Sequence, residues 1–546
     1  MASLDELVIA FITKNALPSS TSAESAAEKM TGANTALENN HDFNEIEQAF
    51  ARLLKTHGVN APSPANKRGA PAAQRGASSN AMEKRQQPVH VSAPYRFVSV
   101  EDRVIPGTVI DISTPQPGHL SASIAVTWKA ESPLLIGETR TETIKGKGPQ
   151  TVLAPFTLGG ESEYAIPGAS LRGMIRAAVE TVAMARLSPI NDHLACGFTH
   201  TRQRRSVGDV LRNGHPHHTI KAAEQHTPDF VENLFGYVVE PTDPGMAEGT
   251  RAAASKIARR GRVAFSMATL APQEKPQTRD SIETVLMGPR PSFAPFYLDY
   301  PPSAGTTRLA GRKRYLPRFP DPAGKTPKEF VERMAAQQIT NIIAASKGKP
   351  VSGDVKCRLQ FLLPEEGKQA ITFTSTIRLS NVSEAELGAV LFALTHGGCL
   401  SHSGTQAETP FRHMIGHAKP FGAGQVKVEA AVLSVKWNNT AGKETQVDHR
   451  RFLEAFQAHM RSNGVTGFPN TPSLREFLGA CCPAETAKVG AGSLRYLDLD
   501  EYQQVKKACV AHKGKRPAPL KPAHGTALIE KHATRLLPAP SYIIPS

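Results

Sequence analysis

The chain has 546 residues, enough for roughly two to four domains with buried cores. Lys and Arg number 64 against 49 Asp and Glu, and the formal charge of +15 favours a polyanionic partner, with nucleic acid first among them. The sequence shows no basic leader followed by an apolar core and no apolar run near the ~18 residues that span a membrane, so we expect a cytoplasmic protein without membrane contact. Its six cysteines are scattered without a CxxC pair, which argues against a disulfide framework or a zinc ribbon.

The first 60 residues contain two short helical patterns. Apolar residues recur at helical spacing from Leu4 to Ile12 and again from Phe43 to Leu54. Two such helices bury little by themselves, so we expect a helical N-terminal extension that docks on the main body or on a partner. Residues 61–92 are rich in Pro, Ala, Ser, Gln, Lys and Arg, and they predict a disordered linker.

The main body is expected at residues 93–440. Residues 120–130 alternate between apolar and mostly polar side chains, which predicts a half-buried strand. A long polar loop is expected from Glu138 to about Pro149. Residues 164–166 then end a strand that turns at Pro167-Gly168 into a helix. Strand, loop, strand and helix in this order predict an α+β sheet with its helices on one face, as in a ferredoxin-like unit.

The helix after this turn carries the first candidate binding residues. Ser170 can cap it, because its hydroxyl can accept a hydrogen bond from a first-turn amide. Arg172 and Arg176 are four residues apart, on a different side from the apolar stripe. Helix-start amides, the helix dipole and two guanidinium groups together favour a phosphate ligand. The alternative is an ordinary capped helix with solvated arginines. The stripe comprises Leu171, Met174, Ile175, Ala178, Val179 and Val182.

A second group of candidates lies between Arg308 and Arg318. Five cations occur in these eleven residues, with Tyr315 among them and Phe319 directly after. Such a mixture suits RNA, because the charges hold phosphates and the rings can stack on bases. The alternative is a solvated basic loop. The candidate RNA ligands in this stretch are Arg312, Lys313 and Arg314.

A second strand–helix unit follows. Residues 371–379 alternate as in a strand, and Ser383 with Glu386 forms a capping box that opens a helix. A strand over residues 426–437 shows a phase slip near Ala431, which predicts a bulge. The two strand–helix units are therefore expected to be two related domains, although no identity between them is visible.

A glycine-rich loop from Gly416 to Gly424 precedes that last strand. Glycines at this spacing let the backbone approach a ligand closely and expose amides to it. The loop is not a Walker loop, because it lacks the GK[ST] ending and leads into a strand. We take Lys419, Gly422 and Gly424 as candidate RNA ligands.

Residues 441–546 are expected to form a helical C-terminal extension and a Lys- and Pro-rich tail. One helical pattern runs from Phe452 to Met460 and stops at Asn463-Gly464, and a shorter one includes Leu474, Phe477 and Leu478.

Several of these stretches, in this order, resemble motifs of the RAMP superfamily of CRISPR-associated proteins. The resemblance covers about residues 95–437 and leaves out both terminal extensions. The matching stretches are Pro133-Leu-Leu-Ile-Gly137, Ile166-Pro-Gly-Ala-Ser-Leu-Arg-Gly-Met-Ile-Arg176, Leu234-Phe-Gly236, Gly261-Arg-Val-Ala-Phe265-Ser, Pro289-Arg-Pro-Ser-Phe293 and Lys419-Pro-Phe-Gly-Ala-Gly424.

This resemblance implies two ferredoxin-like (RRM-like) units that bind CRISPR RNA. It implies a subunit of a type III-like effector complex in antiviral defence, with target RNA and other effector subunits as further partners. The length looks more like a large RAMP protein than a small backbone subunit. On the same grounds, the helix at Ser170–Arg176 and the loop at Gly422–Gly424 would lie near the guide RNA as a non-catalytic scaffold. Such a scaffold contacts phosphates while base pairing reads the sequence.

The alternative is an endoribonuclease of the same superfamily. Some members cut target RNA with an acidic residue in the loop after the first strand, and Mg²⁺ is then required. Here that loop, residues 138–156, has no Asp, so Glu142 is the candidate. Other relatives process precursor RNA with a histidine acid or base, for which His217 is the candidate. Without nuclease activity no cofactor is expected. Zinc binding by His215–His218 with Cys196 is disfavoured by the irregular spacing, and a surface loop is the preferred interpretation.

Overall fold

The computed structural model describes a large part of the chain in two compact units, Met1–Glu83 and Lys84–Ser546. None of the helices among the described residues has the length and apolar character needed to cross a membrane. The described residues are 4–14, 26, 43–57, 89–91, 93–144, 148–159, 163–187, 210, 214–218, 226–239, 257–286, 297, 308–321, 324–345, 356–398, 409–438, 447, 449–488, 494–497, 500–501, 503 and 520–522.

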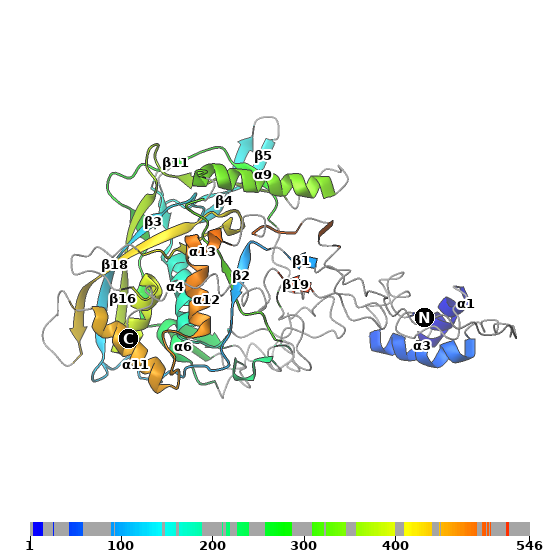
Figure 1. Cartoon of the computed structure of the whole chain (residues 1–546), viewed down its shortest axis with the longest axis horizontal. Coiled ribbons are helices and arrows are strands. Elements are labelled where there is room, and N and C mark those ends of the chain that lie inside the picture. Colours follow the sequence, from blue (N-terminus) through cyan, green and yellow to red (C-terminus); the bar gives the residue numbers. More distant parts are fainter. Residues whose placement is uncertain are drawn as a thin grey trace, which may run out of the picture. The chain divides into compact units, whose positions relative to one another are not determined.

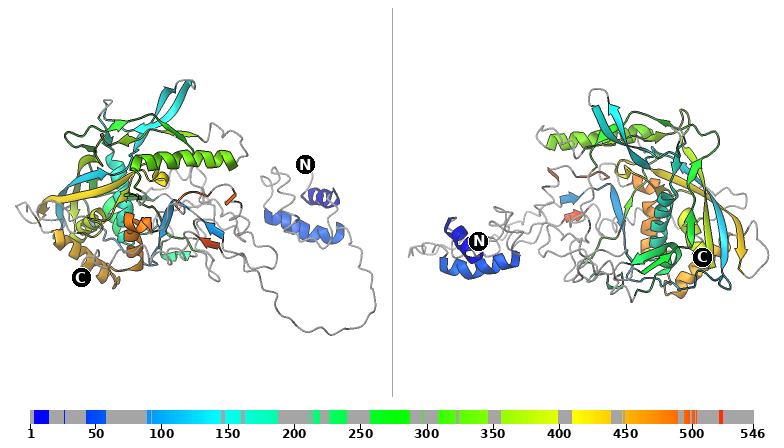
Figure 2. Two further views of the ribbon diagram at one scale, coloured as in Figure 1. Left: turned by 45° about the horizontal axis from the view of Figure 1, so that its top comes forward. Right: turned by 180° about the vertical axis from the view of Figure 1, so that it is seen from behind.

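Two helices form the described part of the N-terminal unit. α1 spans Leu4–Lys14 and α3 spans Phe43–His57, and both are blue in Figure 2. Val8 of α1 and Phe50 of α3 are fully buried, and the rings of Phe11 and Phe50 meet edge-on with centroids 6.0 Å apart. The two helical patterns in the sequence are therefore confirmed.

A seven-stranded sheet organises the second unit (Figure 1). Its central strand β3 pairs antiparallel with both β16 and β18. Side chains along β3 alternate strictly between buried and partly exposed, as the sequence pattern predicts. The predicted bulge is also present, between Val432 and Ser434 of β18. The strands of this sheet are β3 (Leu120–Ala130), β6 (Ala165–Ile166), β9 (Val263–Phe265), β10 (Ala268–Leu270), β16 (Ile371–Val382), β17 (His413–Met414) and β18 (Gln425–Trp437).

The α+β class is confirmed, but the two expected strand–helix units share this one sheet. In chain order β3, α4, β9–β10, β16, α10 and β18 follow the βαββαβ sequence of a single ferredoxin-like unit. The order across the sheet is β18-β3-β16-β10, with β9 also pairing with β16. Each strand–helix half would by itself leave a strand edge unpaired and an apolar sheet face to be covered. When β3 pairs between β16 and β18, the edges of the two halves are hydrogen-bonded and their apolar faces join in one core. The described residues therefore do not confirm two ferredoxin-like units, because both strand–helix halves belong to one sheet.

Helices α4 (Gly168–Val182) and α10 (Glu384–Thr395) belong to the main hydrophobic core with the sheet. The predicted capping box at α10 is present, and nearly all of this helix is buried. The reason is α11 (His449–Ser462), whose Phe452, Leu453 and Phe456 enter the same core. α12 (Pro472–Ala480) and α13 (Pro483–Ala487) follow. These C-terminal helices were expected as an extension, but they complete the core of the body.

A second core lies between a four-stranded sheet and α9 (Pro327–Ala345), at the top of Figure 1. The sheet has the order β12-β14-β5-β4. Two of its strands, β4 (Gly137–Ile144) and β5 (Gly148–Pro155), pair antiparallel where a polar loop was expected. That expectation is wrong because Thr residues favour strands, while polar side chains on both faces leave no apolar alternation to detect. The other two strands are β12 (Ile282–Thr284) and β14 (Cys357–Leu359).

The remaining pairs are short. Val89–Val91 forms β1, which pairs in parallel with β19 (Leu520–Pro522). The predicted disordered linker, residues 61–92, therefore contains a strand near its end. Residues 61–88 of that linker lie outside the described residues. The other elements are β2 (Tyr95–Val98) with β13 (Arg312–Tyr315), β7 (Gly236–Val239) with β8 (Ile257–Arg260), β11 (Gln277–Thr278) with β15 (Leu362–Leu363), α6 (Phe230–Phe235), and the short helices η1 (Pro216–His218) and η4 (Lys419–Phe421).

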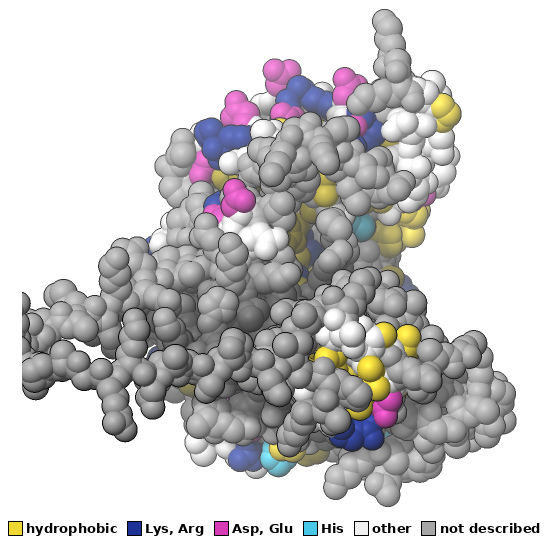
Figure 3. Space-filling view, turned by 90° about the vertical axis from the view of Figure 1, so that its right-hand side faces the viewer, with side chains coloured by type: hydrophobic (Ala, Val, Ile, Leu, Met, Phe, Trp, Pro, Cys, Tyr) yellow, Lys and Arg dark blue, Asp and Glu magenta, His cyan; other side chains and the backbone are white. Residues whose placement is uncertain are grey.

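Charges on the four-stranded sheet are balanced locally. In Figure 3, basic and acidic side chains are interspersed at the top of the view, where α9 and this sheet lie. Glu283 of β12 pairs with both Lys356 (2.9 Å) and Arg358 (3.0 Å). This surface is therefore not a basic patch of the kind that attracts a polyanion.

We predict that Gly388→Ala destabilises the body. A Cβ at this position of α10 would lie 1.9 Å from the Phe452 carbonyl oxygen of α11, so the two helices would have to separate. We expect a loss of about 1–3 kcal/mol in the free energy of unfolding, measured by chemical denaturation. Gly173→Ala in α4 is the matched control, because a Cβ there meets nothing within 4 Å. It should gain about 0.5–1 kcal/mol, and equal effects of both changes would contradict this account of helix packing.

Candidate nucleic-acid interface

The basic stretch expected between Arg308 and Arg318 forms one strand of a two-stranded antiparallel ribbon. In this ribbon Lys313 of β13 is opposite Phe97 of β2, and Tyr315 is opposite Tyr95. Because successive side chains of a strand point to opposite faces, the basic stretch divides into two sets. Arg312 and Arg314 leave one face of the ribbon, and Lys313 and Tyr315 leave the other.

The arginine face holds α4 in place. Arg312 donates to the carbonyl of Ala185, just after the helix, and Arg314 donates to the carbonyl of Ala177 and, at 2.5 Å, to the Thr181 hydroxyl. Burial lowers the pKa of both guanidinium groups. These two candidate RNA ligands therefore use donors on acceptors of α4 and of the residue stretch directly after it.

The opposite face carries a cluster of lysines and tyrosines. Lys313 Nζ lies 3.9 Å from the ring centroid of Tyr95, 5.0 Å from that of Tyr315 and 5.9 Å from that of Tyr297. Burial, and then the neighbouring charge of Lys419, lower the pKa of Lys313 to about 8. The sequence pattern offered no signal for Tyr297, because this residue lies outside the basic stretch in the sequence.

Lys419 reaches the same cluster from the glycine-rich loop. Its Nζ lies 6.0 Å from the Tyr315 ring centroid, and burial and then Arg314 lower its pKa. Both lysine side chains are partly exposed, and no carboxylate among the described residues pairs with either ammonium. Two candidates from distant stretches of sequence thus converge on one tyrosine ring. We call Lys313, Lys419, Tyr95, Tyr297 and Tyr315 the lysine–tyrosine cluster.

The glycines of the loop from Gly416 to Gly424 pack against the protein's own backbone and do not present their amides to a ligand. The amide of Gly422 donates to the Lys419 carbonyl (3.0 Å), and that of Gly424 donates to the Pro133 carbonyl (2.9 Å). Both glycines are buried, and a Cβ on Gly424 would lie 1.8 Å from the Ile415 carbonyl oxygen. The close approach that requires glycine is to the protein's own backbone. The expectation that this loop exposes amides to a ligand is therefore wrong, and Lys419 is its remaining candidate.

At the start of α4, the residues expected to bind a phosphate also have partners within the protein or another role. Pro167 is the N-cap and no side chain caps the helix, because α4 begins at Gly168 and Ser170 already lies in its first turn. Arg172 donates to the Phe235 carbonyl. Arg176 donates to the Gly236 carbonyl (3.1 Å) and pairs with Glu180 at 2.9 Å. Ser170 is thus not a cap, and both arginines stabilise the carbonyl end of α6.

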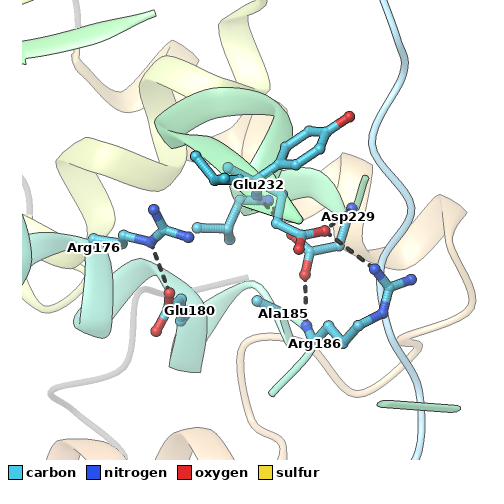
Figure 4. A pocket seen from close by; sticks show the side chains of 9 residues that line it. Arg176, Glu180, Ala185, Arg186, Asp229 and Glu232 are labelled. Carbon is cyan, nitrogen blue, oxygen red and sulfur yellow. Dashed lines mark hydrogen bonds and ion pairs between the residues drawn. The ribbon is translucent and has the colours of Figure 1, made fainter. Parts of the chain in front are cut away.

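A cavity of about 110 Å³ lies beside Arg176, between α4, α6 and β7 (Figure 4). Asp229 caps α6 and accepts from the backbone amide of Arg186 at 2.7 Å. Glu232 accepts from the Arg186 guanidinium at 3.1 Å, and His226 Nε2 lies 3.2 Å from the same carboxylate. Burial, and then the charge of Asp229, raise the pKa of Glu232 to about 7. In this network Arg186 pairs with Glu232, whereas the Asp229 carboxylate accepts backbone amides.

The histidine candidates are mainly structural. His217 is exposed, whereas His215 and His218 beside it are buried. His218 accepts from the Leu187 amide (3.1 Å) through Nδ1 and faces the Glu101 carbonyl (2.8 Å) through Nε2. Burial lowers the pKa of His218 to about 4. The imidazole is therefore neutral and ties three segments of chain together, and only His217 faces solvent.

Glu142 lies in β4, opposite Gln150 of β5, and is partly exposed. In the portion of the chain that the structure describes, no group of three or more His, Cys, Asp or Glu residues is placed to hold a metal ion. Cys196, considered with the histidines as a zinc ligand, lies outside the described residues.

No protein-family model matches this chain, and no curated protein matches it. Among solved structures, it is similar to the crystal structure of Thermofilum pendens Csc2, at 14% identity over 65% of this chain and 79% of that chain. The TM-score is 0.23, too low for the similarity to support a conclusion on fold or function.

We predict that Glu232→Gln changes how stability depends on pH. Burial raises the pKa of Glu232 from 4.5, its ordinary value, to about 7 in the folded protein. The folded state therefore holds this proton more tightly than the unfolded chain, and the free energy of unfolding falls as the pH rises from 4.5 through 7. The neutral amide has no such loss, and the melting temperature of the variant relative to the parent should therefore be higher at pH 8 than at pH 5. The exposed Glu454→Gln serves as the control. A constant difference across this pH range would contradict the assignment.

Proposed function

We propose that the chain is an RNA-binding RAMP subunit of a type III-like CRISPR effector complex. In this proposal it is a non-catalytic scaffold of antiviral defence that contacts the guide RNA backbone and assembles with target RNA and other effector subunits. Support comes from the ordered sequence stretches that resemble the RAMP superfamily and from the formal charge of +15. The observation that carries RNA binding is the convergence of Lys313 and Lys419 on the Tyr315 ring.

The lysine–tyrosine cluster has the chemistry of a single-strand contact. Its two ammonium groups lack carboxylate partners among the described residues, so each is available to a phosphate. Tyr95 is buried in the core beneath them, so stacking on bases without regard to sequence falls to the partly exposed rings of Tyr297 and Tyr315. Because the glycine amides are used inside the protein, the proposed contact relies on side chains. Such a contact binds guides of differing sequence, as a scaffold requires.

We expect Lys313→Ala and Lys419→Ala each to weaken binding of single-stranded RNA by a similar factor across unrelated sequences. Each lost phosphate contact should lower the slope of log affinity against log salt by about 0.7–1. Lys436→Ala, at an exposed lysine of β18, is the matched control and should leave the slope unchanged. Filter binding at several salt concentrations measures both quantities. Strong sequence selectivity, or equal effects of all three changes, would sink the proposal.

The pH dependence gives an independent test of the same cluster. With a pKa of about 8, Lys313 is mostly protonated at pH 7 and mostly neutral at pH 9. RNA affinity should therefore fall over this range, because the neutral amine cannot attract a phosphate. Lys313→Arg keeps its charge at both pH values and should show a smaller fall. If the variant and the parent lose affinity equally, Lys313 does not contact the RNA.

The alternative proposal, an endoribonuclease, makes opposite predictions. Purified chain with guide RNA, complementary RNA and Mg²⁺ would then cut the target, and Glu142→Ala would abolish the cut. Cutting of precursor RNA without metal, lost in His217→Ala, would support the acid–base form. We expect intact RNA with the parent chain and with both variants. Cleavage by the parent that either change abolishes would replace the scaffold proposal.

A further inference from the structure

The cavity beside Arg176 has charged side chains on two sides and an opening to solvent. Figure 4 shows Arg176 and Glu180, both from α4, on one side, and Arg186 with Glu232 on the other. Val238 of β7 also lines the cavity and is 58% exposed. The cavity therefore reaches the surface at β7, and a ligand can enter it there.

Both sides of the cavity carry polar atoms that the protein leaves unused. Arg176 donates to Glu180 through Nε (2.9 Å) and to the Gly236 carbonyl through Nη1 (3.1 Å), and its Nη2 has no partner among the described residues. Glu232 accepts from the Arg186 guanidinium through Oε2 (3.1 Å), whereas its Oε1 accepts from none of the residues that the structure describes. Nε of Arg186 is buried without a hydrogen-bond partner. A ligand here would meet donors and acceptors together.

The charges that line the cavity argue against an ion as the ligand. Arg176 and Arg186 are accompanied by the carboxylates of Glu180, Asp229 and Glu232. A free oxyanion would approach these carboxylates, and a metal ion would approach the guanidinium groups, and contacts between like charges are costly. A neutral ligand that brings its own donors and acceptors avoids both costs.

The size and the walls of the cavity suit a flat ring. Its volume is about 110 Å³. Since one water needs about 10–15 Å³ of cavity, there is room for a group of roughly ten non-hydrogen atoms, the size of a nucleobase. Ala185, Val231 and Val238 supply apolar wall, and the Tyr237 ring is also part of the lining. Apolar and aromatic walls of this kind hold the faces of a base, while polar groups at its edges identify it.

We infer that this cavity binds a guanine base. Guanine has two adjacent acceptors, O6 and N7, on one edge and two adjacent donors, N1–H and N2–H, on another. Arginine is the usual partner of the first edge, and a carboxylate can accept both hydrogen bonds of the second. In this site the unused Nη2 of Arg176 serves O6 and N7, and the Glu232 carboxylate accepts from N1–H and N2–H. Adenine and cytosine lack this combination of edges.

The guanine pocket goes beyond the proposed function, in which the contacts are to phosphates. It shares no residue with the lysine–tyrosine cluster. Guanine occurs in free nucleotides and in RNA, and both present the same two edges. One base-reading position leaves the rest of a guide unread, so the pocket and a sequence-independent scaffold are compatible.

Calorimetric titration of the full chain with guanosine, adenosine and cytidine tests the inference. These neutral nucleosides carry no phosphate that the exposed lysines would attract. The titration is made at pH 8, where Glu232, with a pKa of about 7, is mostly ionised. Guanosine should bind saturably, and adenosine and cytidine should bind at least about tenfold more weakly. Equal binding of the three nucleosides, or no heat from millimolar guanosine, would overturn the assignment.

Two variants test the residues named for the two edges of the base. Glu232→Gln should weaken guanosine binding about tenfold or more, because an amide cannot accept both hydrogen bonds. Glu454→Gln, at an exposed position of α11, is the matched control and should bind guanosine as the parent does. Arg176→Lys keeps the positive charge but loses the planar donors, and it should also weaken binding, whereas Arg333→Lys, exposed on α9, should not.

Melting curves without ligand show which variants are folded. If Arg176→Lys does not fold, Glu232→Gln decides, because its uncharged amide does not depend on ionisation in this buried site. Unchanged guanosine affinity in folded Glu232→Gln would overturn the inference.

Displacement of guanosine by RNA identifies the source of the base. An oligouridylate that contains a single guanosine is compared with plain oligouridylate. Displacement by the first RNA alone assigns the pocket to a guanine within RNA, and displacement by neither assigns it to a free nucleotide. Equal displacement by both RNAs would contradict recognition of guanine. Loss of RNA binding in the lysine variants with guanosine binding intact would count against the proposed function alone.

Discussion

The pairing of β3 with both β16 and β18 is the constraint on which the rest of the body depends. It joins β3, at residues 120–130, to two strands that lie more than two hundred residues later in the chain. The three strands have 11, 12 and 13 residues. α4 and α10 pack in the same core as this sheet, and α11 covers α10. The loop that leads into β18 carries Lys419, and the ribbon that carries Lys313 is held to α4 by Arg312 and Arg314. The lysine–tyrosine cluster therefore exists only when the sheet has formed.

Local sequence patterns predicted the individual elements well. The alternation of residues 120–130, the capping box of α10 and the helical stripe of α4 all appear where the sequence places them, because each depends on neighbours in the chain. That the two strand–helix halves share one sheet could not be read this way. Which strand edge pairs with which is decided by long-range hydrogen bonding, and the same strand–helix pattern fits two small sheets or one larger sheet.

The candidate site shows the same division. The sequence singles out cations and glycines as candidates, but their roles depend on what lies opposite them in space. Arg172, Arg312 and Arg314 meet backbone carbonyls, and the Gly424 amide meets the Pro133 carbonyl, so their donors are used within the fold. No spacing rule foresees that Tyr297 approaches Lys313. Sequence composition alone therefore does not assign a donor atom to a ligand or to the fold.

The environment of Lys313 has a consequence for covalent chemistry. An amine with a pKa of about 8 is in part unprotonated in neutral solution, and an unprotonated amine is a nucleophile. Acylating and carbonyl reagents should therefore modify this side chain ahead of ordinary surface lysines. Acylation would remove the positive charge while leaving the tyrosine rings in place, so a single enzymatic or chemical event could separate electrostatic attraction from stacking in the same cluster.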